Sequence, residues 1–286
     1  MLHVGDRRIR ITIDESSGAI AEIQDLKVCD GVIKYPSAAV RAPFGIVCLD
    51  EQGRRREYTA GPVADSQAAS GSRLALRHDY LVEAGCGSPD SPGRADLSCR
   101  WQVDAETGPG GASSWRIGVE NNSEDLTVVE VVFPLVRGIR LGRDHADNVL
   151  VFPHHAGERI VDPAHTIASD RYRQFWRAGT VRGPDGIYSR EINYCGLASM
   201  TWMDLYGRAP DGGFFGLYMA SHDPSFVLTG VRSESGGPDI PWCGLGFRKH
   251  VPVSPGGRWE SAPFIIAVHD GDWHWGALQY RGWILN

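Results

Sequence analysis

The sequence predicts an all-β protein, a large antiparallel sandwich followed by one short helix. Runs in which apolar and polar residues alternate recur along most of the chain, and the 35 glycines and 17 prolines fall mostly between those runs. Alternation with a period of two places apolar side chains on one face of a strand, and glycine and proline favour turns. Only the C-terminal residues switch to helical spacing. We therefore expect strands from residue 1 to 269 and a helix over 272–285.

The alternation is clearest in the first strand pair. Ile9, Ile11 and Ile13 share one face, Ser17-Gly18 marks a turn, and 19–26 forms the return strand. Further strands are expected at 44–49, 73–82, 95–103, 115–120, 128–135, 148–152, 200–205, 213–221, 225–231, 243–250 and 264–268. Longer loops are expected at 85–94, 107–114 and 154–194.

Composition and charge exclude several classes of partner. Hydrophobic residues make up 42% of the 286, and the formal net charge is −6. Because nucleic-acid binding depends on concentrated positive charge and Arg54–Arg56 is the longest basic cluster, we expect no nucleic-acid partner. No apolar run approaches the roughly 20 residues that span a bilayer, so we expect no membrane partner. The first ten residues lack a secretory signal, which predicts a cytoplasmic location, with secretion the alternative if a signal has been removed.

The six cysteines are scattered, with no C-x-x-C pair. This spacing supports neither a disulfide framework nor a zinc site, and we expect free thiols and no cofactor.

The last 17 residues, 270–286, are expected to form a linker helix. Trp273, Tyr280 and Ile284 recur at helical spacing and should face the sandwich, with Trp273 buried. Large aromatic side chains that remain exposed mark an interface with another domain or a second copy of the chain. The rings expected to serve that interface are Trp275 and Trp283.

Several segments of the chain occur in an order that resembles a known family. They are WRIGVENNS (115–123), VVFPLVRGI (131–139), FPHHAG (152–157), ASMTWMDLY (198–206), GLYMASHD (216–223), GDWHW (271–275) and YRGW (280–283). Together they resemble a galactose-mutarotase-like β-supersandwich. In particular they resemble the uncharacterised bacterial domain family found N-terminal to glycoside hydrolase barrels, akin to the front domains of endo-α-N-acetylgalactosaminidase-like enzymes.

The resemblance implies that a supersandwich leads through a linker helix into a (β/α)₈ barrel that carries the catalytic carboxylates. Such a barrel takes about 250 residues, for which this chain has no room. We therefore expect 1–269 to be a carbohydrate-facing domain of a glycoside-hydrolase-type protein, and 270–286 to lead to a catalytic barrel absent from this chain. Such a domain would bind or support sugar without hydrolysing it alone. Two alternatives stay open, an aldose mutarotase or epimerase on the same fold and a purely structural buttress.

Sugar sites combine flat aromatic faces with planar polar groups. Trp202 and Asp204 should share one face of a strand, His222 follows a strand, and Trp176 and Trp242 lie in loop-like sequence. The adjacent His154 and His155 should point to opposite sides of an extended chain, so they are expected to contact sugar rather than share a metal. The predicted substrate-binding residues are thus His154, His155, Trp176, Trp202, Asp204, His222 and Trp242, with no metal site.

The mutarotase alternative needs a histidine acid and a carboxylate base. No spacing in the sequence singles out one pair. The candidates are His154, His155 or His222 as the acid and Glu191, Asp204 or Glu260 as the base.

Overall fold

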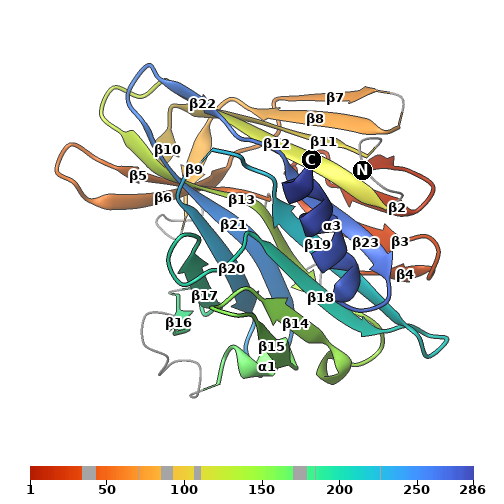
Figure 1. Cartoon of the computed structure of the whole chain (residues 1–286). Coiled ribbons are helices and arrows are strands. Elements are labelled where there is room, and N and C mark those ends of the chain that lie inside the picture. The colour runs from red at the N-terminus through yellow and green to blue at the C-terminus, as the bar shows by residue number, and fades with distance from the viewer. Residues whose placement is uncertain are drawn as a thin grey trace.

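The computed structural model describes residues 1–33, 43–69, 71–84, 93–105, 111–169, 179–183, 185–225 and 227–286. Within these residues the named strands pair antiparallel in three sheets, and the two larger sheets pack around one core (Figure 1). This confirms the predicted all-β sandwich with a short C-terminal helix. None of the helices in the described part of the chain has the length and apolar character to cross a membrane.

Neighbouring strands in each sheet occur in the following spatial order. The nine-stranded sheet contains β10 (Arg94–Ala95), β9 (Leu81–Glu83), β6 (Arg55–Ala60), β5 (Gly45–Leu49), β13 (Thr127–Ile139), β21 (Cys243–Val253), β20 (Thr229–Ser235), β17 (Tyr188–Asn193) and β16 (Val181–Arg182). The ten-stranded sheet contains β15 (Glu158–Val161), β14 (Val149–Phe152), β18 (Trp202–Arg208), β19 (Phe214–Ser221), β23 (Phe264–Asp270), β12 (Ala112–Asn121), β11 (Leu97–Asp104), β8 (Arg73–His78) and β7 (Asp65–Ala69), with β22 (Arg258–Glu260) paired to β12. The small sheet contains β1 (Leu2–Gly5), β2 (Ile9–Ile13), β3 (Ile20–Asp25) and β4 (Asp30–Gly31). The helical elements described are η1 (His145–Asp147), α1 (Pro163–Thr166) and α3 (His274–Leu285).

Aromatic side chains fill the space between the two large sheets. Trp101 and Trp115, from neighbouring strands of the ten-stranded sheet, are fully buried and stack with ring centroids 5.8 Å apart. Phe133 reaches them from β13 of the nine-stranded sheet, and its ring lies 5.7 Å from that of Phe264. Aromatic pairs of this kind contribute about 0.5–1.5 kcal/mol beyond the area they bury. The core thus joins the two sheets through large rings rather than aliphatic side chains alone.

The N-terminal strands follow the predicted alternation. Ile9, Ile11 and Ile13 of β2 are all fully buried. Ion pairs connect the small sheet to the end of β23, because Arg8 and Lys27 both pair with Asp270.

Two predictions about the chain path are wrong. The predicted strand 73–82 is divided between β8 and β9, which pair in different sheets, since alternation along a chain does not identify the neighbouring strand. The predicted loop 154–194 contains β15, α1, β16 and β17, whose short runs were hidden among polar residues. The predicted loop 85–94 falls largely on 85–92, outside the described residues. Half of the predicted loop 107–114 also lies outside them, and its last three residues belong to β12 instead.

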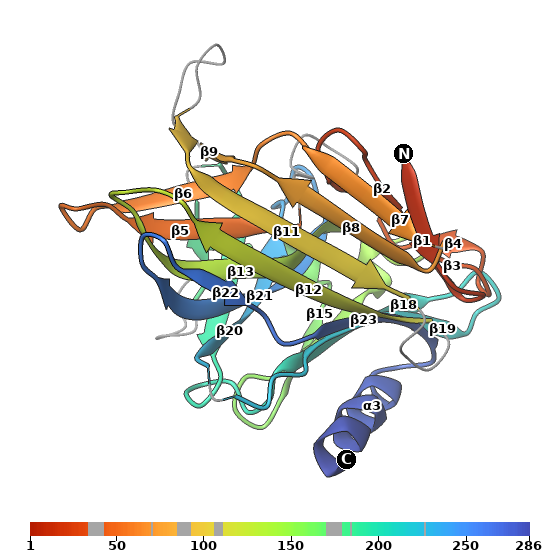
Figure 2. The ribbon, with the colours of Figure 1, turned by 90° about the horizontal axis from the view of Figure 1, so that it is seen from above.

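Helix α3 lies against the outer surface of the ten-stranded sheet (Figures 1 and 2). Trp275 stacks on His269 of β23 with centroids 4.7 Å apart, and Trp283 stacks on His222 at 4.5 Å. Both rings are half-buried by their own chain, so the expectation that they are exposed is wrong. The interface with a downstream domain or a second copy stays a prediction.

The burial of these rings differs from the expectation because of where α3 begins and which of its residues face the sheet. The helix begins at His274, two residues later than predicted, and Gly276 brings it close to the sheet. Tyr280 is buried and its hydroxyl lies 3.0 Å from Oγ1 of Thr201. Trp273 is half-buried rather than fully buried. Ile284, which was expected to face the sandwich, is 58% exposed.

Two glycines of α3 provide a matched test of this packing. An ideal Cβ at Gly276 would lie 2.5 Å from Oδ2 of Asp204 and 2.8 Å from Cδ2 of Tyr218, whereas one at Gly282 would have no neighbour within 4 Å. We expect Gly276→Ala to lower the free energy of unfolding by about 1–2 kcal/mol, because overpacking outweighs the gain in helix propensity. Gly282→Ala should be neutral or stabilising by up to about 1 kcal/mol. Urea unfolding measures both, and equal effects of the two substitutions would contradict the packing.

Candidate functional site

Seven charged side chains form a continuous chain of ion pairs on the outer face of the nine-stranded sheet. They occupy outward positions because Val231, Leu245 and Phe247, which alternate with them on β20 and β21, point into the core. We call this set the charge array. In order it comprises Arg55, Glu130, Arg248, Glu191, Arg232, Glu234 and Arg137.

The most enclosed carboxylate of the array is Glu234 on β20. One oxygen lies 2.6 Å from Nε of Arg137 and the other lies 2.7 Å from Nε of Arg232. The Glu234 side chain is 0% exposed. Burial alone would raise its pKa, but the two guanidinium groups more than offset this and lower the pKa to about 2.

The other two glutamates are also held between arginines. Glu191 lies 3.1 Å from Nη1 of Arg232 and 2.8 Å from Nε of Arg248. Glu130 pairs with Arg248 and lies 3.0 Å from Nη1 of Arg55. Burial opposes ionisation of Glu130, yet the hydrogen bonds and positive charge of its two partners lower its pKa overall. Every carboxylate of the array is therefore bridged by two guanidinium groups.

Trp242 lies at the end of the array beside Glu234. An ideal Cβ at Gly244 would lie 3.1 Å from Cζ3 of Trp242 and 3.3 Å from Oε2 of Glu234, so glycine leaves room for both side chains. A cavity of about 130 Å³ opens next to the array, with Arg137 and Arg232 among the residues that line it. This face thus places a largely buried indole, 3% exposed, beside fixed planar polar groups. It holds the predicted substrate-binding Trp242 and the predicted base Glu191; the other six charged residues were missed.

A second group of predicted residues lies beneath α3. Trp202 is 5% exposed and packs on Tyr218 and Tyr280. Asp204 Oδ2 lies 3.0 Å from Nε2 of His269, and both side chains are 0% exposed. Burial raises the pKa of Asp204. These predicted residues share one face of the sheet, as expected, but α3 covers that face.

His222 belongs to the same covered surface, where it stacks on Trp283. Burial lowers its pKa to about 4, which keeps the imidazole neutral near pH 7. His154 and His155 lie elsewhere, with ring centroids 4.3 Å apart. The expectation that they point to opposite sides is wrong, because His155 has a φ of 52° and the chain is not extended there. Nδ1 of His154 lies 3.2 Å from Nη2 of Arg190, whose guanidinium is fully buried. Burial, followed by the charge of this arginine, lowers the pKa of His154.

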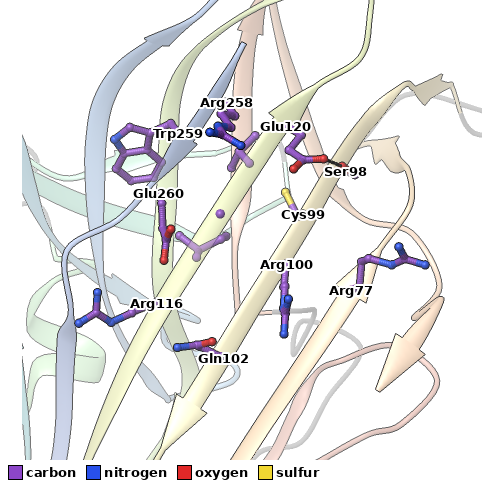
Figure 3. Close-up of a pocket in the computed structure, with 13 residues that line it drawn as sticks. Arg77, Ser98, Cys99, Arg100, Gln102, Arg116, Glu120, Arg258, Trp259 and Glu260 are labelled. Atoms are coloured by element: carbon purple, nitrogen blue, oxygen red, sulfur yellow. Dashed lines mark hydrogen bonds between the residues drawn. The ribbon is translucent and has the colours of Figure 1, made fainter. Parts of the chain in front are cut away.

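The remaining candidates are separated from these groups. Trp176 lies outside the described residues. Glu260 lines a groove on the ten-stranded sheet and, within the described residues, it makes no ion pair (Figure 3). The sugar-contacting and acid–base roles assigned from the sequence stay predictions.

The groove in Figure 3 has a volume of about 790 Å³. It forms where long side chains of β8, β11, β12 and β22 surround Gly118. Arg100, Arg116 and Arg258 line it without an ion-pair partner in the described part of the chain. Trp259 is half-buried: it packs against the hydrophobic core and also lines the groove. This lining is charged and solvated, unlike the interlocked groups of the charge array.

Comparison with known proteins shows the fold but no family. No family model matches the sequence, and no curated protein matches it. A galactose mutarotase-like protein from Lactobacillus casei is similar in structure, with a TM-score of 0.52 and 10% identity over 94% of this chain and 100% of that chain. An α-galactosidase from Lactobacillus brevis matches with a TM-score of 0.52 and 8% identity over 95% of this chain. This chain spans 39% of the α-galactosidase. These likenesses show the galactose-mutarotase-like fold that the sequence resemblance predicts.

The pKa of Glu234 predicts how stability depends on pH. The folded value of about 2 lies below the ordinary 4.5, so the stabilisation is complete above about pH 4.5 and is lost as pH falls toward 2. The Glu234→Gln variant lacks this contribution. We expect the wild type to exceed it in stability near pH 7 and this advantage to shrink by roughly 3 kcal/mol on acidification. Urea unfolding at several pH values measures the difference. Glu260→Gln serves as the control, and a wild-type advantage over Glu234→Gln that does not change with pH would contradict the buried pairing.

Proposed function

We propose that this chain is a sugar-binding β-supersandwich whose ligand surface is the charge array together with Trp242. It supports the action of a catalytic partner and does not hydrolyse glycosides by itself. The fold likeness to a galactose mutarotase-like protein and to part of an α-galactosidase favours a carbohydrate role. The pairing of every array carboxylate with two guanidinium groups is the observation that carries the proposal.

The array suits polyhydroxylated ligands because its groups are planar and fixed in position. A guanidinium has five N–H donors, so arginines that hold carboxylates retain donors for hydroxyl groups. The ion pairs fix the orientation of the side chains before a ligand arrives, which reduces the entropy lost on binding. Trp242, which is 3% exposed, packs next to Glu234. Arrangements of a few placed polar groups beside an aromatic are typical of small-ligand sites.

The same geometry disfavours proton transfer. A general base is most effective when its pKa lies near the working pH, whereas the pKa values of Glu130 and Glu234 are lowered. His250 lies beside the array, and its Nδ1 lies 3.8 Å from Oε1 of Glu130. That distance exceeds a hydrogen bond. Glu130 is moreover engaged by Arg55 and Arg248. On this face a mutarotase would use His250 as the acid and Glu130 as the base, neither of which is among the candidates named from the sequence.

A catalytic partner is part of the proposal because this chain spans 39% of the similar α-galactosidase. We propose that α3, which is attached to the sandwich through Trp275, Tyr280 and Trp283, provides a firm support for that partner. Its exposed residues Leu278, Ile284 and Leu285 are available for contact.

Substitutions on the two outer surfaces test where sugar binds. Methyl α-galactoside, methyl α-glucoside and N-acetylgalactosamine are titrated into the protein by calorimetry. Arg232→Lys keeps the positive charge but loses the planar fork, and we expect it to weaken binding of the sugar that the wild type prefers by roughly tenfold or more. Arg100→Lys in the groove of Figure 3 is the matched control and should leave binding unchanged.

The opposite pattern, loss in Arg100→Lys with retention in Arg232→Lys, would move the site to the groove. Absence of binding by the wild type to all three sugars would contradict the proposed function. Exchange between the anomers of free galactose separates the alternatives. We expect no acceleration, and an acceleration abolished by Glu130→Gln would identify a mutarotase.

A further inference from the structure

Two histidines and an aspartate meet at one end of the β14–β15 hairpin, apart from the charge array. Val149 of β14 lies opposite Val161 of β15, so the residues before β14 and after β15 are brought together. His145 lies in η1 before β14. Asp162 immediately precedes α1, and His165 lies within it.

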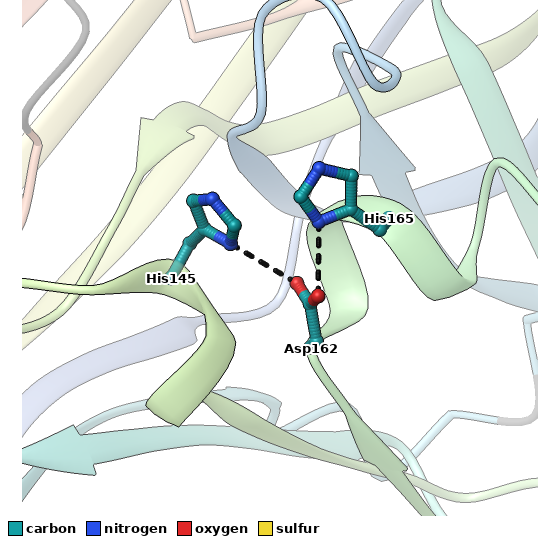
Figure 4. Close-up of side chains that lie close together, drawn as sticks. All are labelled: His145, Asp162 and His165. Atoms are coloured by element: carbon teal, nitrogen blue, oxygen red, sulfur yellow. Dashed lines mark hydrogen bonds and ion pairs between the residues drawn. The ribbon is translucent and has the colours of Figure 1, made fainter.

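Both imidazoles present Nδ1 to the same carboxylate (Figure 4). His145 Nδ1 lies 3.2 Å from Oδ1 of Asp162, and His165 Nδ1 lies 2.9 Å from Oδ2. The potential ligand atoms of all three residues lie within 4.8 Å of one another. The three side chains are 22%, 26% and 38% exposed in chain order, so an ion can reach them from solvent.

The backbone at Asp162 favours this arrangement over ordinary helix capping. Asp162 is the N-cap of α1, a position where aspartate usually accepts a hydrogen bond from the first turn of a helix. Here its side chain makes no such bond, and the residue adopts a left-handed conformation with φ 49° and ψ 61°. The carboxylate is thereby available to the two histidines. Left-handed backbone outside glycine is costly by about 1 kcal/mol, and such cost tends to be retained at functional positions.

We propose that His145, Asp162 and His165 bind a divalent transition-metal ion, with Zn²⁺ as the representative. Two imidazole nitrogens and one carboxylate oxygen match the ligands of zinc and its neighbours, whereas calcium and magnesium prefer oxygen alone. Ligand atoms about 2.0–2.1 Å from a tetrahedral ion lie about 3.3 Å apart, close to the two nitrogen–oxygen distances in this cluster.

Three protein ligands leave a coordination position open for water or a further donor. Asp144 offers an additional carboxylate, whose Oδ1 lies 3.9 Å from Nδ1 of His145. Its Oδ1 accepts a hydrogen bond from the backbone of Ala146. The site would link η1 to α1 and stabilise that end of the hairpin. It is independent of the charge array, so its failure would leave the proposed sugar-binding function untouched.

Calorimetric titration of Zn²⁺ into untagged protein, freed of metal with a chelator, tests the proposal. We expect one equivalent of Zn²⁺ to bind, and we expect Asp162→Asn and His165→Gln each to weaken binding by roughly tenfold or more. His274→Gln is the matched control, because Nδ1 of His274 lies 2.8 Å from Oδ1 of Asp272 in an exposed pair. Within the described residues no third ligand joins His274 and Asp272, so the control should bind Zn²⁺ as the wild type does.

Thermal unfolding distinguishes lost binding from lost folding. Asparagine matches aspartate in size and tolerates left-handed backbone, so Asp162→Asn should unfold near the wild-type temperature in the presence of chelator. Added Zn²⁺ should raise the unfolding temperature of the wild type and of His274→Gln but not that of Asp162→Asn. The proposal is wrong if the wild type binds Zn²⁺ no more tightly than Asp162→Asn, or if His274→Gln loses as much affinity as His165→Gln.

Discussion

The outer surface of the nine-stranded sheet depends on one constraint, the alternating pairing of glutamate and arginine in the charge array. A buried carboxylate such as Glu234 is stable only when its charge is matched, and removing one partner from a buried pair typically costs about 3–5 kcal/mol. Because Arg232 and Arg248 each pair with two glutamates, the array extends across the sheet from β6 to β17. The four arginines of the array exceed its three glutamates by one charge, which Glu57, 3.2 Å from Nη2 of Arg55, balances. A rigid row of planar donors results, held in place before any ligand binds.

The other large sheet presents a different outer surface. Beneath α3, the Asp204–His269 pair and Trp202 are enclosed by Trp275, Gly276 and Tyr280, and this enclosure raises the pKa of Asp204. Farther along, the groove around Gly118 carries arginines that solvent surrounds. Neither surface offers carboxylates fixed between arginines. The polar groups beneath α3 are covered, those of the groove are solvated, and those of the charge array are fixed by ion pairs. For this reason we place the proposed ligand surface on the nine-stranded sheet.

Much of the fold follows from period-two alternation, as in β2, where three isoleucines face the core. Alternation does not identify which strands pair with each other. The sequence therefore predicts one strand over 73–82, where the structure has β8 and β9. The site was harder to predict because Glu130, Arg232 and Arg248 lie far apart in sequence and are adjacent only through strand order. An alternating Arg-x-Glu on 232–234 was a local signal, yet its partner Arg137 is remote. The His145–Asp162–His165 cluster was missed because spacings of 17 and 3 residues match no common metal motif.

The central claim is that sugar contacts the charge array. Nuclear magnetic resonance of arginine Nε–H and tryptophan indole N–H groups, recorded while methyl α-galactoside is added, observes both outer surfaces in one experiment. The account predicts that the signals of Arg137, Arg232, Arg248 and Trp242 shift with a common saturation, whereas those of Arg100, Arg116 and Arg258 stay in place. Shifts confined to the three groove arginines, with an unchanged array, would contradict it.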